Sequence, residues 1–181
     1  KSLDTLENEI ENANNAFKKN LGYIPNIFSY PYGEYSLQIK ELIKKKKFKA
    51  AFGQQSGIIF NEIDLFELPR FSMNEKYGDI DRVKFISQSK GMGVYDFIPS
   101  DPHIIENPPY IGFSLLDSHL EAKINCFVFD KKGEVKNDNL QFNERIDNRL
   151  MRKLHKGRSR LNCTAKDNLD NWRWFGYQFY L

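Results

Sequence analysis

Hydrophobic positions in the first half of the chain recur at a helical spacing in three places. Apolar residues follow one another every three or four positions from Leu3 to Leu21, which predicts an amphipathic helix. Ser2 or Asp4 can cap its start, and Gly22 can end it. Two further helical patterns begin at Ser36 and near Asp79.

Short apolar runs between these helices predict strands at residues 27–30, 48–52 and 65–71. Helices that alternate with strands in this way are typical of a parallel sheet or barrel with helices outside it. A full barrel of this type needs about 200 residues or more. We therefore expect residues 1–100 to form part of an α/β domain, built on either a parallel sheet or an incomplete (β/α) barrel.

The second half of the chain has a different pattern. Glycines and prolines are frequent over residues 91–110, which predicts a linker or a domain crossing. Period-two alternation then predicts antiparallel strands, and residues 171–181 show it most clearly. We expect residues 101–181 to form a small antiparallel β-sandwich, so the predicted fold class is α/β plus all-β. The other predicted strands are residues 111–115, 122–130 and 133–135.

Composition narrows the class of protein. With 40% hydrophobic and 14% aromatic residues, the 181-residue chain can build a core. Its net charge is only +3, and the one basic run, Lys44–Lys47, ends a predicted helix, where cations are favoured. We therefore expect no nucleic-acid partner.

No apolar stretch approaches the roughly 18 residues of a membrane span. The chain opens without an initiator Met or a signal peptide, so we expect a processed protein or a piece of a longer one.

The two cysteines, Cys126 and Cys163, both lie in strand-like segments. They allow one structural disulfide and hence an exported protein, and two buried free thiols are the alternative. Neither has a neighbour at metal-ligand spacing, so a zinc–thiolate site is not expected.

The stretch from Phe28 to Tyr35, Phe-Ser-Tyr-Pro-Tyr-Gly-Glu-Tyr, joins a predicted strand to a predicted helix. Pro31 stops the strand and Gly33 permits a tight turn, so a rigid loop should present tyrosines around exposed backbone. Ligands of α/β folds bind at such strand ends. An ordinary strand-to-helix turn with aromatic packing is the alternative.

This stretch resembles the third conserved motif of the metal-dependent polysaccharide deacetylases, the NodB-homology carbohydrate esterases. The segments Leu-Pro-Arg-Phe-Ser-Met-Asn-Glu (68–75) and Gly-Arg-Ser-Arg-Leu-Asn-Cys-Thr (157–164) are similar to the branch with a β-rich C-terminal extension. The resemblance implies a deacetylase-type barrel followed by that extension. It also implies metal-dependent hydrolysis of N-acetyl groups on an N-acetylglucosamine-type polysaccharide, with zinc as the expected metal. The implied location is secreted, periplasmic or cell-surface.

The resemblance also assigns roles to individual residues. The backbone N–H of Tyr32 would stabilise the oxyanion, with Pro31 fixing the loop and Tyr30 beside the substrate. Ser29 stands where many members carry an arginine that orients the catalytic base, and Arg70 is the candidate substitute. A surface ion pair of Arg70 with Glu75 or Asp79 is the alternative. Asn74 and Glu75 would line the sugar cleft, or else cap the following turn.

The family's metal-binding motifs, an Asp-Asp pair and a His-x-x-x-His segment, are absent from this chain. His103, His119 and His155 are too dispersed to replace them, so no metal ligand is assigned within the sequence. The divalent metal would be held by a missing N-terminal segment of the same protein, and this chain alone would be inactive. His103 is either the general acid or a plain loop residue.

Three hypotheses therefore remain open. The first is the polysaccharide deacetylase. The second is a non-catalytic carbohydrate-binding or structural module that retains a deacetylase-like shell. The third is an unrelated α/β protein. Trp172 and Trp174 would stack on sugar rings or fill the sandwich core.

Overall fold

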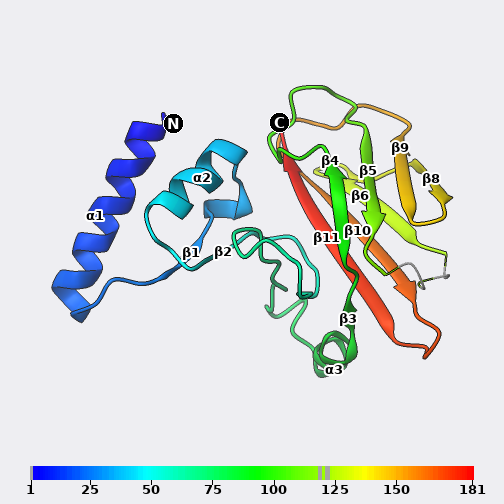
Figure 1. Cartoon of the computed structure of the whole chain (residues 1–181), viewed down its shortest axis with the longest axis horizontal. Coiled ribbons are helices and arrows are strands. Elements are labelled where there is room, and N and C mark those ends of the chain that lie inside the picture. Colours follow the sequence, from blue (N-terminus) through cyan, green and yellow to red (C-terminus); the bar gives the residue numbers. More distant parts are fainter. Residues whose placement is uncertain (1, 118–119, 121–122) are drawn as a thin grey trace.

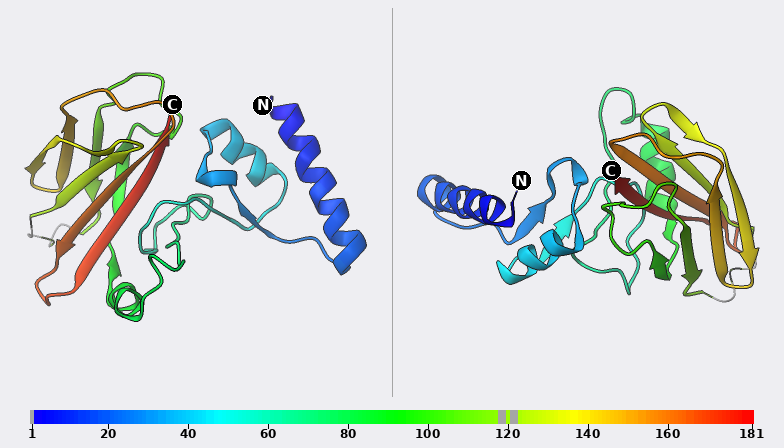
Figure 2. Two further views of the ribbon diagram at one scale, coloured as in Figure 1. Left: turned by 180° about the vertical axis from the view of Figure 1, so that it is seen from behind. Right: turned by 90° about the horizontal axis from the view of Figure 1, so that it is seen from above.

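The computed structural model describes residues 2–117, 120 and 123–181 and places them in an elongated arrangement (Figure 1). A helical first part leads through an irregular segment into two packed β-sheets (Figure 2). No helix among these described residues is long and apolar enough to cross a membrane. The elements in chain order are α1 (Leu3–Leu21), β1 (Ile27–Ser29), the short 3-10 turn η1 (Pro31–Gly33), α2 (Leu37–Lys45), β2 (Ala50–Phe52), α3 (Ile80–Gln88), β3 (Lys90–Gly91), β4 (Val94–Ile98), β5 (Ile111–Leu115), β6 (Asn125–Asp130), β7 (Gly133–Val135), β8 (Asn137–Phe142), β9 (Arg145–Leu150), β10 (Arg158–Lys166) and β11 (Trp172–Tyr180).

Local sequence explains where the three helices begin. The side-chain oxygens of Ser2, Ser36 and Asp79 each accept a backbone N–H three residues further on, at 3.2, 3.3 and 2.9 Å. Such caps satisfy orphan donors of the first turn and typically contribute about 1 kcal/mol each. Gly22 ends α1 in the left-handed conformation, with φ of 80°. The three predicted helix starts are confirmed.

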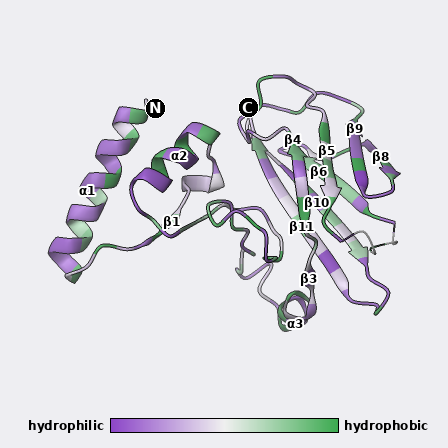
Figure 3. Ribbon diagram, in the orientation of Figure 1, coloured by the Kyte–Doolittle hydropathy of each residue, from purple (hydrophilic) through white to green (hydrophobic). Residues whose placement is uncertain are grey.

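The first part of the chain has a small core of its own. β1 and β2 pair in parallel, with Ile27 opposite Ala50. Hydrophobic and hydrophilic residues are interspersed along α1, which buries only Ile10 (Figure 3). The buried members of this core are Ile10, Tyr30, Tyr35, Ile43, Phe48 and Ala51.

The second part is a β-sandwich. One sheet has five strands in the order β3-β11-β10-β6-β7, and the other has four in the order β4-β5-β9-β8. Within the sheets, only the pairing of β3 with β11 is parallel. Alternate residues of β10 are buried, so one of its faces points into the sandwich. The predicted sandwich is confirmed. Two residues of the sequence analysis lie outside the described residues. They are His119 and Ala122, the first residue of the predicted strand 122–130.

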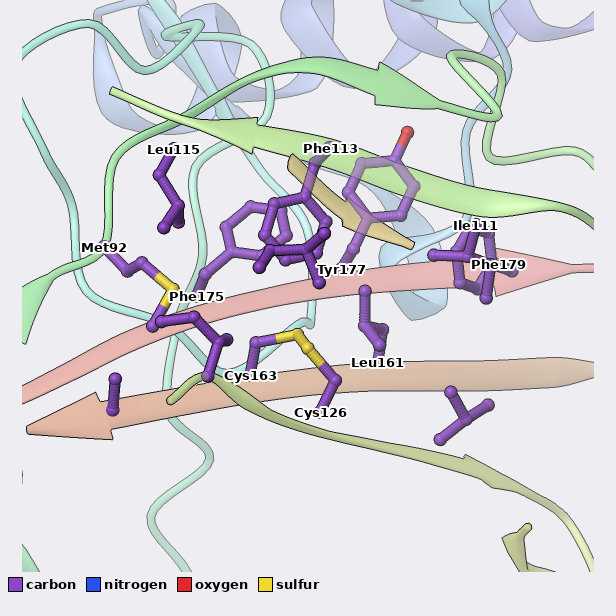
Figure 4. Packing of buried hydrophobic residues seen from close by; sticks show 14 of the residues in the cluster. Met92, Ile111, Phe113, Leu115, Cys126, Leu161, Cys163, Phe175, Tyr177 and Phe179 are labelled. Carbon is purple, nitrogen blue, oxygen red and sulfur yellow. A yellow bond between two sulfur atoms is a disulfide. The ribbon is translucent and has the colours of Figure 1, made fainter. Parts of the chain in front are cut away.

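Aromatic and aliphatic side chains from both sheets fill the space between them (Figure 4). Phe113 of the four-stranded sheet meets Phe175 of the five-stranded sheet, at a ring distance of 5.5 Å. Cys126 and Cys163 form a disulfide inside this core. They are direct cross-strand partners on β6 and β10, with Cα atoms 4.1 Å apart. The expected disulfide is confirmed.

Residues 53–57 lie against the sandwich, because Ser56 approaches the backbone of β11 closely. A Cβ atom built on Gly176 of β11 would lie only 1.8 Å from the Ser56 carbonyl oxygen, so glycine is required there. Gln178, also on β11, donates from its Nε2 to the carbonyl oxygen of Tyr32 at 3.0 Å. β11 therefore bonds directly to the loop that joins β1 to α2.

The expected partial (β/α) barrel is wrong. The described part of the chain has only β1 and β2 as a parallel pair outside the sandwich, and residues 65–71 add a single bridge, Phe52 to Leu68. β4, the candidate for the last barrel strand, pairs antiparallel with β5 in the four-stranded sheet. Alternation of helices and short apolar runs does not reveal which strands pair, and here β3 and β4 pair with strands that follow them. The division into residues 1–100 and 101–181 stays a prediction.

Candidate functional site

The loop between β1 and α2 is held in a constrained conformation. Tyr32 has φ of 58° and ψ of 8°, the left-handed region that costs a non-glycine residue roughly 1–2 kcal/mol. Gly33 follows with φ of 73°, and a Cβ there would lie 2.5 Å from the Gln54 nitrogen. Pro31 fixes the start of the turn. The Tyr32 side chain is 67% exposed despite this constraint.

Two buried tyrosines support the loop from beneath. The rings of Tyr30 and Tyr35 stack with centroids 4.4 Å apart, and the Tyr30 hydroxyl donates to the Phe66 carbonyl oxygen at 3.2 Å. Burial raises the pKa of Tyr30, and the charge of Glu67 adds to the effect. Both tyrosines therefore stay neutral and serve as rigid support.

An ion-pair cluster fixes α2 behind this support. Lys40 of α2 donates to Glu67 at 2.5 Å and to Asp64 at 3.1 Å. Burial alone would lower the pKa of Lys40, but its hydrogen bonds to Glu67 and Asp64 raise it on balance. The cluster is only partly exposed, so it holds α2 in a defined position relative to residues 64–67.

A hollow of about 570 Å³ opens beside the loop, and we call it the loop hollow. The start of α1 and the C-terminal end of β11 both lie in the upper part of the view in Figure 1. Both contribute to the walls, together with the loop and the start of α2. The lining residues are Ser2, Leu3, Leu6, Phe28, Tyr30, Pro31, Tyr32, Glu34, Ser36, Gln38, Ile39, His103 and Tyr180.

A stacked aromatic pair from the sandwich forms one wall of the loop hollow. The rings of His103 and Tyr180 lie 4.9 Å apart at an interplanar angle of 19°. Burial raises the pKa of Tyr180 to about 12, and the charges of Asp101 and Glu34 add to the effect. Tyr180 is thus a neutral hydrogen-bonding phenol near neutral pH. The hollow combines flat aromatic surface with hydroxyl, amide and carboxylate groups.

The structure brings some of the predicted site residues together and not others. Tyr30, Pro31 and Tyr32 all line the loop hollow. The backbone N–H of Tyr32 donates to no acceptor among the described residues. Arg70 is not in the lining; it lies half-buried on the segment that bonds to Gln55. No ion pair joins Arg70 to Glu75 or Asp79 in the described part of the chain.

Asn74 and Glu75 also lie outside the loop hollow. The Asn74 Oδ1 accepts the backbone N–H groups of Lys76 and Tyr77, both at 3.0 Å, as an Asx turn does. Glu75 is exposed on the same turn. Asn74 therefore has the turn-capping contact that was the alternative to a place in the sugar cleft.

The two tryptophans of β11 lie on the outer face of the five-stranded sheet, away from the sandwich core. Phe85 of α3 packs edge-on against Trp172 at 5.9 Å and tilted against Trp174 at 6.1 Å. Phe71 covers Trp174 from the other side at 5.0 Å. Trp174 is thus covered by α3 and its preceding segment, and neither tryptophan lines the loop hollow.

Sequence reasoning missed the contribution of β11 to the site, whereas His103 of the 99–103 loop was already a candidate. Tyr180 and Gln178 share the outward face of β11, which period-two alternation indicated. What the pattern could not show is that the loop between β1 and α2 lies against this face. Ser36 and Gln38 were recognisable only as the start of a helix.

The described residues do not fit a catalytic metal. No group of three or more His, Cys, Asp or Glu side chains among them could hold an ion. His103 of the loop hollow stacks on Tyr180, and the His155 Nδ1 bonds at 2.7 Å to the buried carboxylate of Asp130. Neither histidine belongs to a ligand set in this part of the chain.

Comparison with known proteins gives a partial family match. The family model described as polysaccharide deacetylase matches residues 1–51, which include α1, the loop and α2. No curated protein matched the chain.

Among solved structures, CopC from Methylosinus trichosporium OB3b has a TM-score of 0.40 at 12% identity, covering 49% of this chain and 90% of that one. PcoC, a copper resistance protein from Escherichia coli, has a TM-score of 0.38 at 12% identity, covering 48% and 96%. Neither structural likeness is close enough to assign a function, whereas the family match connects the first part of this chain with polysaccharide deacetylases.

Proposed function

We propose that this chain is a non-catalytic carbohydrate-binding module whose first part retains a deacetylase-like shell. Its ligand would be an N-acetylated polysaccharide of the N-acetylglucosamine type, bound in the loop hollow. The observation that carries the proposal is Tyr32, an exposed aromatic ring held in a costly backbone conformation at the edge of that hollow. Strained non-glycine residues cluster at functional sites, where the surrounding structure holds them in place.

The chemistry of the loop hollow suits a sugar. Aromatic faces pack on the apolar C–H faces of sugar rings, and Tyr32, Tyr180 and His103 supply such faces. Ser36, Gln38 and Glu34 can bond to hydroxyl and acetamide groups. A volume of about 570 Å³ lies within the range of small-ligand sites, which is about 300–1,000 Å³. A short stretch of a polysaccharide would fit this combination of shape and polarity.

Calorimetric titration with an N-acetylglucosamine oligosaccharide tests the proposal. If stacking covers about 60 Å² of the Tyr32 ring face, the contact contributes roughly 1.5 kcal/mol, or about tenfold in Kd. Tyr32→Ala should therefore weaken binding about tenfold, and Tyr32→Phe should retain it. Tyr23→Ala is the matched control, since Tyr23 is a similarly exposed tyrosine (59%) outside the hollow. Unchanged affinity of Tyr32→Ala, or no binding by the unaltered chain, would refute the proposal.

The second candidate is a metal-dependent polysaccharide deacetylase, and the family match over residues 1–51 favours it. In that case the metal ligands would come from outside the described residues, and the unbonded N–H of Tyr32 would be the oxyanion donor. Arg70 and Glu75 would contribute only in this candidate. This chain alone should release no acetate from the same oligosaccharide under either candidate. The two are separated by measuring acetate release, with and without added Zn²⁺, from a longer form of the protein that supplies the metal ligands. Release at a rate dependent on the metal would favour the enzyme.

An exported location accompanies both candidates. The buried disulfide between Cys126 and Cys163 forms and persists in oxidising compartments, and it is rare in the cytosol. A polysaccharide outside the cytoplasm would be accessible to a protein secreted, periplasmic or displayed at the cell surface.

A further inference from the structure

A second cleft lies beside the loop hollow, and three basic side chains line it. It has a volume of about 530 Å³ and is formed by β6, the turn after it, the start of β10 and Glu34 of the loop. Its charged walls include Lys131, Arg158 and Arg160, and we call it the basic cleft. Arg158 and Arg160 are two positions apart on β10, so both side chains leave the same face of the sheet.

The positive charge of the basic cleft is only partly neutralised by the protein. Glu34 is 3.5 Å from the Nε of Arg158, and both side chains are partly exposed. The Asp130 carboxylate, also in the lining, is fully buried and engaged by Arg152 and His155. No carboxylate pairs with Arg160 among the described residues. Desolvation and the neighbouring charge of Arg158 lower the pKa of Arg160, so an anion between the two would relieve a repulsion.

The basic cleft and the loop hollow share a wall. Glu34 lines both, and the Arg158 guanidinium lies over the Tyr32 ring at 5.3 Å. One extended ligand could therefore contact the exposed ring of Tyr32 and continue past Glu34 towards Arg160. Phe129, which is opposite Arg160 on β6 and 40% exposed, adds an apolar surface on the far side.

We propose that the basic cleft binds an anionic group, a carboxylate or a phosphate, on the same glycan that occupies the loop hollow. Guanidinium groups bind both anions through paired hydrogen bonds, and two arginines side by side favour such binding over a single cation. This inference rests on the proposed function, because the glycan would bring the anionic group to the cleft. It makes the ligand an acidic or acid-substituted polysaccharide.

Titration with two oligosaccharides of equal length tests this inference. One alternates N-acetylglucosamine with glucuronate, and the other is the neutral N-acetylglucosamine oligomer. At low ionic strength the charged oligosaccharide should bind about ten- to a hundredfold more tightly. Arg160→Gln should remove this advantage and leave the affinity for the neutral oligomer unchanged. Arg149→Gln on β9 is the matched control, because it removes the same charge from an exposed position in the other sheet.

Inorganic phosphate is the third probe, and it distinguishes a free anion from a glycan-borne one. Phosphate should weaken only the binding of the charged oligosaccharide, and only when Arg160 is present. Two results would refute anion binding in the basic cleft: equal affinity for the two oligosaccharides, or equal losses of affinity for the charged one in Arg160→Gln and Arg149→Gln. The loop hollow would then remain as a site for a neutral sugar. A third result is that the chain binds phosphate through Arg160 and neither oligosaccharide. That result would show that the anion is not carried by a glycan, and it would also refute the proposed function.

Discussion

Replacing Tyr32 by glycine should weaken sugar binding about tenfold at almost no cost in stability. Tyr32 occupies the left-handed region with φ of 58°, and glycine would release about 1–2 kcal/mol of steric strain there. Against this gain, glycine adds about 0.5–1 kcal/mol of conformational freedom to the unfolded chain. Losing the exposed contact with the Arg158 guanidinium costs roughly 0.5 kcal/mol more. The free energy of unfolding of Tyr32→Gly should therefore lie within about 1 kcal/mol of the unaltered chain.

Tyr32→Ala is the informative partner of that variant. Alanine also lacks the ring but keeps its Cβ, so the backbone strain remains. We expect Tyr32→Gly to be more stable than Tyr32→Ala by about 0.5–1 kcal/mol, while both lose about tenfold in affinity for the oligosaccharide. Stability is measured by urea unfolding under non-reducing conditions, and affinity by calorimetry on the same samples.

Two results would refute this reasoning about Tyr32. If Tyr32→Gly is less stable than Tyr32→Ala, the left-handed conformation is not a source of strain. If Tyr32→Gly loses more than about 2 kcal/mol, the ring has a structural role, and its exposure at the hollow no longer argues for a ligand.

Three further predictions concern stability. Asp130→Asn should cost about 1 kcal/mol, because it removes the charge that pairs with Arg152, and water screens the 37% exposed Arg152 side chain. Arg152 and His155 hold the pKa of Asp130 below its unfolded value of about 3.9, so this stabilisation is complete above about pH 5 and is lost as the pH falls below 4. Reduction of the disulfide, which joins residues 37 positions apart, should cost about 4 kcal/mol by loop entropy. Gly176→Ala should cost about 1–3 kcal/mol through its clash with Ser56.

Urea and acid titrations check these values, and each has an outcome that would contradict it. The stability difference between Asp130→Asn and the unaltered chain should narrow progressively as the pH falls below 4, and a constant difference from pH 7 to pH 3 would exclude the Asp130 linkage. An unchanged urea midpoint after reduction would show that the disulfide does not stabilise the folded chain. Gly176→Ala with unaltered stability would mean that residues 53–57 are not held against β11.

Features with a local cause could be predicted from the sequence. Helix starts depend on one side chain and a backbone group three residues away, so Ser2, Ser36 and Asp79 were recognisable. The inward face of β11 followed from strict alternation, which places Phe175, Tyr177 and Phe179 in the core. The disulfide could be predicted only as one of two alternatives. Both cysteines lie in alternating strands, but the sequence does not show the register that makes them cross-strand partners, so free thiols stayed possible.

Features that depend on pairing between distant segments could not be predicted. Residues 65–71 have the composition of a strand, yet Pro69 has no N–H for a ladder and the segment makes one bridge only. β4 was attributed to a barrel because it follows α3, but its partner is β5 in the opposite direction. Arg70 was expected near Tyr32 from a resemblance in sequence order, and the structure places it outside the hollow that Tyr32 lines. Sequence order alone fixes neither a sheet partner nor the direction of a side chain.

The loop hollow needs both parts of the chain, and this limits what a match to the first part can mean. Residues 1–51 supply Tyr32 and its support, whereas the His103–Tyr180 wall comes from the sandwich. The Tyr32 carbonyl is held by Gln178 of the same strand as Tyr180. The loop between β1 and α2 is thus held in this chain by β11 of the sandwich and not by a further barrel strand. The ligand of this chain should therefore be set as much by β10 and β11 as by the segment that carries the family match.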